Sequence, residues 1–246
     1  MRIIISPAKK MKVDEDSLAY LGLPAFLKKT EKIKEFMQGL SLPAAKKLWA
    51  CNDKIAAENF ERFQNMDLNK RLTPAILSYE GIQYQYMAPA VFEKGMLDYI
   101  QEHLRILSGF YGVLRPMDGV TPYRLEMQAR ASIDGSKNLY DFWGEELYKE
   151  VRDESGIIIN LASKEYSKAI EGFLTTEDTM ITCVFGDLED GKVVQKGTYA
   201  KMARGEMVRF MAENNVQSPE ELKSFDKMGY HFVEQWSGEN EFIFAK

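Results

Sequence analysis

Two short apolar runs in this chain lack the alternation of polar and apolar residues that marks a half-buried strand. Residues 2–5 read Arg-Ile-Ile-Ile, and residues 156–161 read Gly-Ile-Ile-Ile-Asn-Leu. A strand that is apolar at successive positions is buried on both faces, as are the central parallel strands of a sheet. The two runs therefore predict central strands of a mixed sheet, contributed by distant parts of the chain.

Two further pairs of segments predict β-hairpins. Residues 179–185 and 192–199 are joined through residues 187–191, and residues 230–235 and 241–245 are joined through residues 237–240. Glycine, acidic and amide residues in such short connections favour a tight reversal of the chain. We expect each pair to form two antiparallel strands.

Helical spacing of apolar residues accounts for much of the remaining chain. The predicted helices span residues 26–38, 43–49, 53–64, 89–107, 143–153, 164–173, 200–214 and 219–224. The sequence contains no internal repeat and no linker rich in Pro, Gly or Ser that would mark a domain boundary. We therefore predict a single compact α+β domain over residues 1–246, with a mixed β-sheet surrounded by helices.

Residues 97–116 form the most informative of these segments. An apolar ridge follows helical spacing and stops at Ser108-Gly109, Gly112 follows three residues later, and Arg115 ends a short apolar run; the ridge residues are Leu97, Ile100, Leu104 and Leu107. A helix that breaks into a glycine-containing hairpin leaves backbone N–H groups free to bind phosphate. The alternative is a glycine C-cap followed by a loop without a ligand.

Composition and charge restrict the possible partners only weakly. The 32 Lys and Arg against 37 Asp and Glu give a net charge of −5, which argues mildly against nucleic acid, although one basic cleft suffices for binding it. Cys51 and Cys183 are far apart in sequence, and two histidines are too few for a metal cluster. No signal peptide or membrane span is recognisable, so we expect a soluble cytoplasmic protein with buried thiols and no membrane partner.

Similar residues follow the two predicted central strands. Ser6-Pro7-Ala8-Lys9 follows the first strand, and Ser163 follows the second, which contains Asn160. Because open α/β sheets bind ligands at the carboxyl ends of their strands, Ser6, Lys9, Asn160 and Ser163 are candidates for an anion site. Ordinary capping of the following helices, with solvated lysines, explains the same residues without a ligand.

The predicted helix 200–214 carries its basic residues opposite its apolar stripe. Lys201, Arg204 and Arg209 lie on one side, and the stripe on the other consists of Ala200, Ala203, Met207, Phe210 and Met211. Gly205 lies among the basic residues, where it would let a bulky partner approach the backbone. This pattern favours contact with a ligand, although a solvated basic face is the usual explanation.

Arginines and tyrosines around residues 105–130 form a third basic region. Arginine suits phosphate because its planar fork donates two parallel hydrogen bonds; the region contains Arg105, Arg115, Arg124 and Arg130. Some of these arginines could instead pair internally with Asp118 and Glu126, and the nearby tyrosines could be core residues rather than stacking platforms.

Recognisable catalytic motifs are absent from the sequence. It contains no nucleotide-cradling glycine loop, no G-x-S-x-G elbow and no H-E-x-x-H pair. We therefore predict no catalytic residue, no cofactor and no metal site, and we favour a binding protein over an enzyme.

Several motifs, in order along the chain, resemble the YaaA family of peroxide-stress-resistance proteins; they lie in residues 4–9, 103–116, 122–127, 139–144, 159–163 and 200–205. The resemblance implies a cytosolic bacterial protein that protects against hydrogen peroxide. It also implies a compact α+β fold with a basic cleft and DNA binding assisted by a helix-hairpin-helix element. Carried over to this chain, Ser108, Gly109 and Gly112 would form the hairpin. Lys9, Arg105, Arg115, Lys201 and Arg204 would line the cleft.

The leading hypothesis is therefore a DNA-binding protein of the peroxide stress response. It would bind the phosphates of double-stranded or structured DNA with little base recognition, using the hairpin and cleft residues together with Arg209. We further expect Lys201→Glu with Arg204→Glu to abolish duplex binding without unfolding the protein, because both residues would face solvent. The alternative is an enzyme acting on a nucleotide or small phosphorylated ligand at Ser6, Lys9, Asn160 and Ser163.

Overall fold

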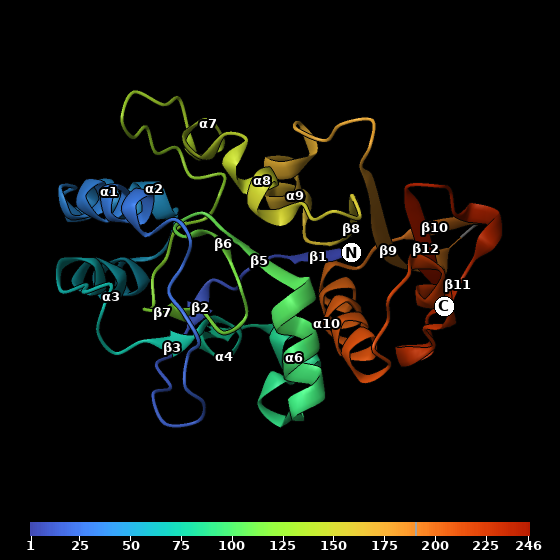
Figure 1. Cartoon of the computed structure of the whole chain (residues 1–246). Helices are drawn as coiled ribbons and strands as arrows, with labels where there is room; N and C mark the ends of the chain where they lie inside the picture. The colour runs from blue at the N-terminus through green and yellow to red at the C-terminus, as the bar shows by residue number, and fades with distance from the viewer. Residues whose placement is uncertain (190) are drawn as a thin grey trace.

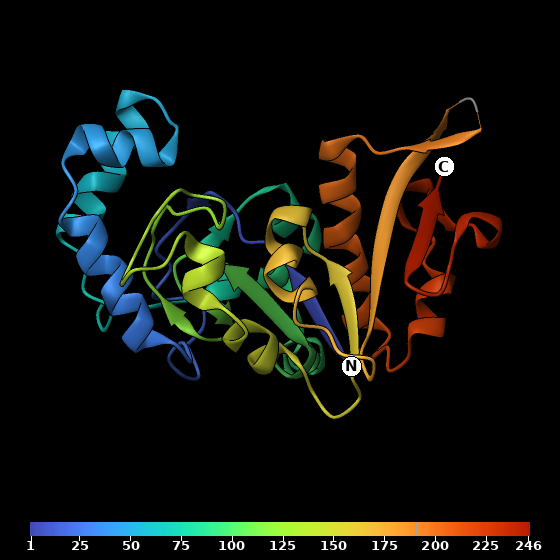
Figure 2. The same cartoon turned by 90° about the horizontal axis from the view of Figure 1, so that it is seen from above.

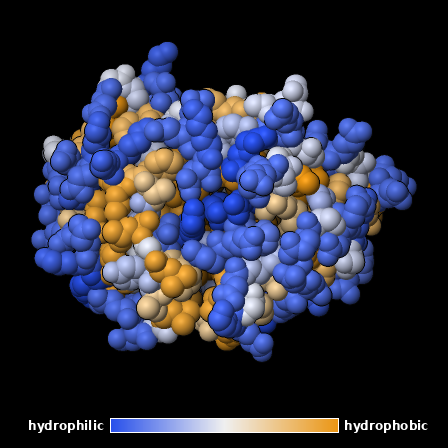
Figure 3. All heavy atoms as spheres, in the orientation of Figure 1, coloured by the Kyte–Doolittle hydropathy of each residue, from blue (hydrophilic) through white to orange (hydrophobic). Residues whose placement is uncertain are grey.

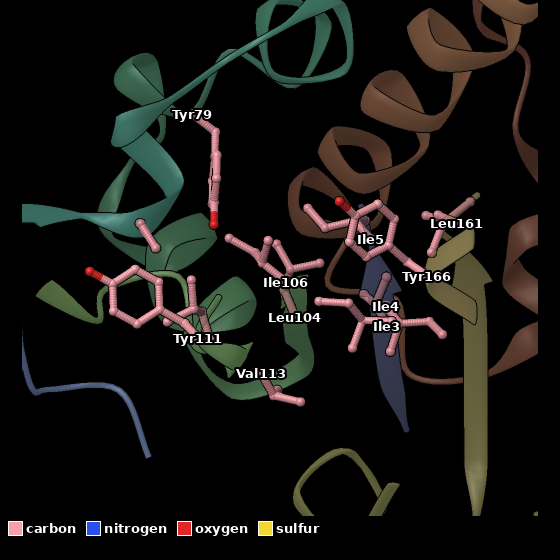
Figure 4. Close-up of a cluster of buried hydrophobic side chains, with 14 of the residues drawn as sticks. Ile3, Ile4, Ile5, Tyr79, Leu104, Ile106, Tyr111, Val113, Leu161 and Tyr166 are labelled. Carbon is pink, nitrogen blue, oxygen red and sulfur yellow. The ribbon is translucent and has the colours of Figure 1, made fainter. Parts of the chain in front are cut away.

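The isoleucine run near the amino terminus forms the centre of the sheet. A computed structural model describes residues 1–189 and 191–246, and in it β1 (Arg2–Ile5) lies between β5 (Leu104–Ser108) and β8 (Ile157–Leu161), parallel to both. Ile3 is in register with Leu104 on one side and Ile159 on the other. Figure 4 shows the three isoleucines between side chains of the neighbouring strands, and all three are fully buried. The prediction of two central parallel strands is confirmed.

Within the described residues, the main sheet has eight strands of mixed direction, in the order β11-β12-β9-β8-β1-β5-β6, with β10 paired to β9. The five strands from β12 to β5 in this order are parallel to one another, and the edge strands β11 and β6 pair with them antiparallel. The remaining strands of this sheet are β6 (Gly112–Leu114), β9 (Thr179–Glu189), β10 (Lys192–Val194), β11 (His231–Phe232) and β12 (Glu241–Ala245). Two small sheets pair β2 (Lys10–Met11) with β4 (Tyr79–Glu80) and β3 (Thr73–Pro74) with β7 (Gly119–Val120).

Helices cover both sides of the sheet, with α8 and α9 on one side and α6 and α10 on the other (Figure 1). Figure 2 shows that α1, α2 and α3 extend beyond the body of the sheet at one end. The α-helices are α1 (Leu27–Gln38), α2 (Leu42–Trp49), α3 (Asp53–Gln64), α4 (Ala75–Ser78), α5 (Ile82–Met87), α6 (Lys94–His103), α7 (Leu139–Trp143), α8 (Glu146–Val151), α9 (Lys164–Glu171) and α10 (Gly197–Glu213). Short 3₁₀-helices are η1 (Pro89–Val91), η2 (Pro219–Ser224), η3 (Lys227–Gly229) and η4 (Glu234–Trp236). The predicted single α+β domain is confirmed.

The predicted helix over residues 89–107 is wrong at its carboxyl end, where residues 104–107 form a strand. The segment forms η1, then α6, and then β5, because the backbone becomes extended at Leu104 (φ −85°, ψ 139°) and the following residues pair with β1. Ser108 to Gly112 then joins β5 to the antiparallel β6. The segment that the resemblance assigns to a helix-hairpin-helix is therefore a β-hairpin that follows one helix.

Other predicted elements differ mainly at their ends. The predicted helix 143–153 is divided into α7 and α8 at Gly144, whose φ of +56° is incompatible with a continuous helix. Residues 197–199, predicted as strand, begin α10, while β9 and β10 do pair antiparallel. Asp190, in the predicted connection between these strands, lies outside the described residues. Antiparallel pairing of β11 with β12 confirms the second hairpin, although η4 interrupts its first segment. Residues 219–224 form a 3₁₀-helix rather than an α-helix.

The described residues contain neither a membrane-spanning helix nor a cluster of metal-binding side chains. None of the helices there combines the length and apolarity that crossing a bilayer requires. No group of three or more His, Cys, Asp or Glu residues in the same part of the chain is placed to hold a metal ion. On the face shown in Figure 3, apolar residues gather over one half and hydrophilic residues border them.

Candidate functional site

The carboxyl ends of β1 and β8 lie side by side, and the chain connects these two strands to later strands on opposite sides of the pair. From β1 the next strand of the main sheet is β5 on one side, whereas β8 leads to β9 on the other. Such a switch point opens a crevice between neighbouring strands, which is where open α/β sheets bind ligands. A cavity of about 410 Å³ lies here, lined by residues 6–10 after β1 and by Ser163, Glu165 and Tyr166 after β8. We call it the strand-end hollow.

Two serines tie the ends of these strands together. Ser6 Oγ accepts a hydrogen bond from the Ser163 amide (2.8 Å) and donates to Ser163 Oγ (3.2 Å). The Tyr84 hydroxyl donates to the Ser6 carbonyl oxygen (3.0 Å). Ser163 therefore opens α9 without capping it through its side chain, and the amino-terminal end of this helix is held beside the hollow.

Three of the four residues predicted for a strand-end site line the hollow: Ser6, Lys9 and Ser163. Asn160 is not among its lining residues. Its side chain is buried, where Nδ2 donates to Thr182 Oγ1 (3.1 Å) and Oδ1 accepts from the Ala162 amide (3.0 Å). Asn160 thus shapes the turn after β8, and its predicted placement in the ligand site is corrected.

The strand-end hollow contains more cations than anions. Its five basic side chains are Lys9, Lys10, Arg124, Lys201 and Arg204, and its three carboxylates are Glu80, Glu126 and Glu165. Glu126 lies 3.1 Å from both Lys9 Nζ and Arg124 Nη2, and Glu80 lies 2.9 Å from Lys10 Nζ. Burial, together with the nearby Glu126 charge, raises the pKa of Glu165. Protonation of Glu165 would therefore increase the positive charge of the hollow.

Lys201 and Arg204 reach the hollow from α10, but their surroundings differ. Lys201 is exposed, whereas Arg204 is partly buried and its Nε atom has neither solvent contact nor a hydrogen-bond partner among the described residues. Burial lowers the pKa of the Arg204 guanidinium. The prediction that both side chains lie on the solvent side of the helix is therefore wrong for Arg204.

Close packing of α10 on α5 sets the position of these two cations. The Gly205 backbone touches α5, since a Cβ atom at this position would lie 2.1 Å from the Gln83 carbonyl oxygen. The glycine therefore admits a neighbouring helix, and the prediction that it admits a ligand is corrected. Gln83 itself lines the hollow.

A second hollow of about 720 Å³ adjoins the first and shares Lys9 and Glu126 with it. We call it the α2 hollow, because α2 contributes more of its lining residues than any other helix or strand does. Its apolar lining residues are Phe36, Leu40, Ala44, Leu48, Trp49, Ala50 and Ala129, and it adds the cations Lys47 and Arg130. We refer to the two hollows together as the cleft, which is lined by seven cationic side chains and three carboxylates.

Three predicted arginines lie elsewhere. Arg105 is only 3% exposed, and its Nη1 donates to the carbonyl oxygens of Gln101, Glu102 and Leu104 at the end of α6; its burial lowers its pKa to about 10. It belongs to the amino-terminal part of β5, away from the strand ends that line the cleft. Arg115 faces Glu150 (3.7 Å) in a smaller hollow, and Arg209 pairs with Glu213 (2.7 Å). Their predicted convergence with Lys9 is corrected.

The hairpin residues are part of the core. Ser108 Oγ accepts hydrogen bonds from the amides of Phe110 (3.1 Å) and Tyr111 (2.9 Å) and bonds with the Tyr123 hydroxyl (2.6 Å). Gly109 packs so closely that a Cβ atom there would lie 2.6 Å from the Leu125 carbonyl oxygen. Gly112, with a φ of +78°, is buried as well. The expectation that Ser108, Gly109 and Gly112 offer free amides to phosphates is therefore wrong.

Several residues of the cleft were not predicted as site residues. They are Lys10, Lys47, Gln83, Arg124, Glu126, Arg130 and Glu165. The only sequence signal for them was the basic region around Arg124 and Arg130, where neighbouring acids made internal pairing an equally good explanation. Gln83 and Lys47 lie in segments that tertiary packing alone brings to the cleft.

Comparison with known proteins identifies the family. The model of a family described as "Peroxide stress protein YaaA" matches residues 1–236. A "UPF0246 protein" of Agathobacter rectalis is 57% identical over 246 residues, covering 100% of this chain and 99% of the relative. "UPF0246 proteins" of Lachnoclostridium phytofermentans and Ligilactobacillus salivarius are 54% and 48% identical, covering 100% of this chain and 96% and 100% of the relatives. Because the family model matches residues 1–236 and these relatives cover the whole chain, the chain belongs to the YaaA family of peroxide stress proteins.

Proposed function

We propose that this protein acts in the peroxide stress response by binding DNA through phosphate contacts in the cleft. The observation that carries the proposal is the local excess of positive charge, with seven cations and three carboxylates in a chain of net charge −5. Contacts to phosphates depend on clustered Lys and Arg side chains rather than on overall charge. The cleft supplies such a cluster within two joined hollows.

The cleft residues have distinct parts in this proposal. Arg204 and Arg124 offer planar guanidinium groups, which suit the oxygens of a phosphate. Lys201 is exposed at the same hollow and would attract phosphates at longer range. Lys9 can exchange its ion pair with Glu126 for one with a phosphate, and because its side chain is 64% exposed, the exchange costs little desolvation.

Binding of this kind recognises the DNA backbone and carries little sequence information. A protein that covers the backbone without base readout can protect many DNA sites, which is consistent with a role in limiting damage during peroxide stress. The buried β5–β6 hairpin has no part in this proposal, and neither have Arg105, Arg115 and Arg209.

The experiment is a titration of a fluorescently labelled blunt duplex at low salt, read by anisotropy. We expect saturable binding, which Lys201→Glu weakens about tenfold or more because it reverses a charge in the cleft. Lys28→Glu is the matched control, since Lys28 is an exposed lysine in the first turn of α1 and is not among the residues lining the cleft. Equal affinities of the two variants, or no saturable binding of the wild type, would contradict the proposal.

A second candidate function rests on the strand-end hollow alone. Its volume of about 410 Å³ lies within the range of small-molecule sites, and it occupies the switch point where α/β folds bind such ligands. An enzyme acting on a nucleotide or a small phosphorylated ligand would use this hollow with Ser6, Lys9 and Arg204. Thermal-shift measurements with nucleotides test this alternative, because a ligand of the folded state raises the unfolding temperature. No shift at millimolar nucleotide would argue against it.

A further inference from the structure

We propose that the α2 hollow receives an unpaired base of the bound DNA, so that the protein prefers DNA with a single-stranded tail over a blunt duplex. The inference rests on the proposed function, in which phosphates occupy the strand-end hollow. It adds a second subsite with different chemistry and thereby specifies the form of DNA that is bound.

The two hollows have complementary linings. The strand-end hollow carries five of the seven cations, whereas the α2 hollow has mainly apolar walls, including Phe36, Leu40 and Leu48, with Lys47 and Arg130 among its lining residues. A nucleotide likewise has a charged part and an apolar part, since its phosphate is charged and its base is a flat, largely apolar ring. Proteins that bind single strands combine a basic groove with apolar or aromatic surfaces for the bases in this way.

Unsatisfied hydrogen-bond donors point to the same place. Among the described residues, seven buried side-chain polar atoms have no hydrogen-bond partner. Four of these atoms belong to residues that line the cleft: Gln83 Nε2, Arg124 Nε and Arg204 Nε at the strand-end hollow, and Trp49 Nε1 at the α2 hollow. Gln83 and Trp49 are only 7% and 3% exposed. Buried donors normally find partners, and four orphaned donors around one cleft suit a ligand rich in acceptors.

The Lys9–Glu126 ion pair lies where the hollows meet, because both residues line both of them. A phosphate bound at Lys9 would place the neighbouring base toward the α2 hollow. A duplex keeps its bases paired and stacked, and taking one out costs a few kcal/mol. An unpaired strand avoids this cost, and for that reason we infer a preference for single-stranded tails.

The test compares two labelled probes, a short blunt duplex and the same duplex extended by a run of unpaired thymidines. We expect the tail to strengthen binding by the wild type about tenfold or more, the effect of one or two stacked bases. Ala44 is exposed and lines the α2 hollow, so Ala44→Trp should fill the hollow and remove the gain from the tail, measured as the ratio of the variant's affinities for the two probes.

Ala57→Trp is the matched control, because Ala57 is exposed on α3 and is not among the lining residues of either hollow. This variant should keep the full gain from the tail, and unchanged unfolding temperatures should show that both variants fold. A tail that gives no gain, or a gain that survives in Ala44→Trp, would overturn the inference while leaving the proposed function intact. Failure of both probes to bind would instead overturn the proposed function.

Discussion

The backbones of Gln83 in α5 and Gly205 in α10 are in direct contact. A Cβ atom at Gly205 would lie 2.1 Å from the Gln83 carbonyl oxygen and 2.9 Å from the Met87 amide nitrogen. Residues next to this crossing, Gln83 and Arg204, both line the strand-end hollow. The helix crossing that only glycine permits therefore also determines where two of the orphaned donors lie.

Gly205→Ala should destabilise the protein. Alanine is the better helix former by about 1 kcal/mol, but here its methyl group meets backbone atoms of α5 that cannot move aside without separating the helices. We expect the clash to dominate and to lower the free energy of unfolding by about 1–3 kcal/mol, measured by urea denaturation.

The matched control is Gly95→Ala in α6, where a Cβ atom would meet nothing within 4 Å among the described residues. This variant should be at least as stable as the wild type, because only the helix preference changes. A Gly205→Ala protein as stable as Gly95→Ala would show that the crossing is not tightly packed.

Cys183 should be inert toward peroxide in the native state. Burial on β9 raises the pKa of its thiol to about 12, and the thiolate is the form that reacts. In a Cys51→Ser background, we expect thiol reagents at pH 8 to label Cys183 only as fast as the protein unfolds, and rapidly in denaturant. Prompt labelling of the native protein, or its rapid oxidation by peroxide, would contradict this expectation.

Asp118 should make stability depend on pH between about 4 and 6. Burial raises its pKa from 3.8 to about 6, against the opposing effects of the Arg115 amide and the Arg105 and Arg115 charges. The folded state therefore binds the proton more tightly than the unfolded state, and the free energy of unfolding falls as the pH rises through this range. Relative to Asp118→Asn, we expect the wild type to lose on the order of 2 kcal/mol between pH 4 and pH 7.

Denaturation of both proteins at several pH values measures this difference. Asparagine can still accept the hydrogen bond from the Arg115 amide, which Asp118 Oδ2 accepts at 2.8 Å, so the loop should keep its conformation. Parallel pH profiles of the two proteins would show that the Asp118 carboxyl does not titrate in this range.

Sequence patterns correctly predicted those parts of the fold whose residues fit only one structural environment. The isoleucine runs of β1 and β8 have no polar face and could only be central strands. Leu104 and Leu107, by contrast, fit helical spacing with Leu97 and Ile100, yet they are buried in β5 beside β1. A helix and a strand would each bury these side chains, and only the pairing with β1, which is distant in sequence, distinguishes the two alternatives.

The candidate site was predictable only where it follows a strand. Ser6, Lys9 and Ser163 come directly after central strands, so chain order alone places them at one edge of the sheet. Arg105 has the same charge as Arg204 but lies in the amino-terminal part of its strand, where it binds the end of α6. Trp49 and Gln83 reach the cleft through helix packing, for which the sequence contains no local signal.

The central claim is that phosphates bind in the cleft, and the salt dependence of duplex binding tests it most directly. The logarithm of the binding constant should fall linearly with the logarithm of salt concentration, with a slope of about −0.9 for each phosphate contact. Arg204→Met, which replaces the guanidinium group with an apolar side chain of similar length at this partly buried position, should make the slope shallower by about one contact. A wild-type affinity independent of salt, or an Arg204→Met slope equal to that of the wild type, would contradict the account.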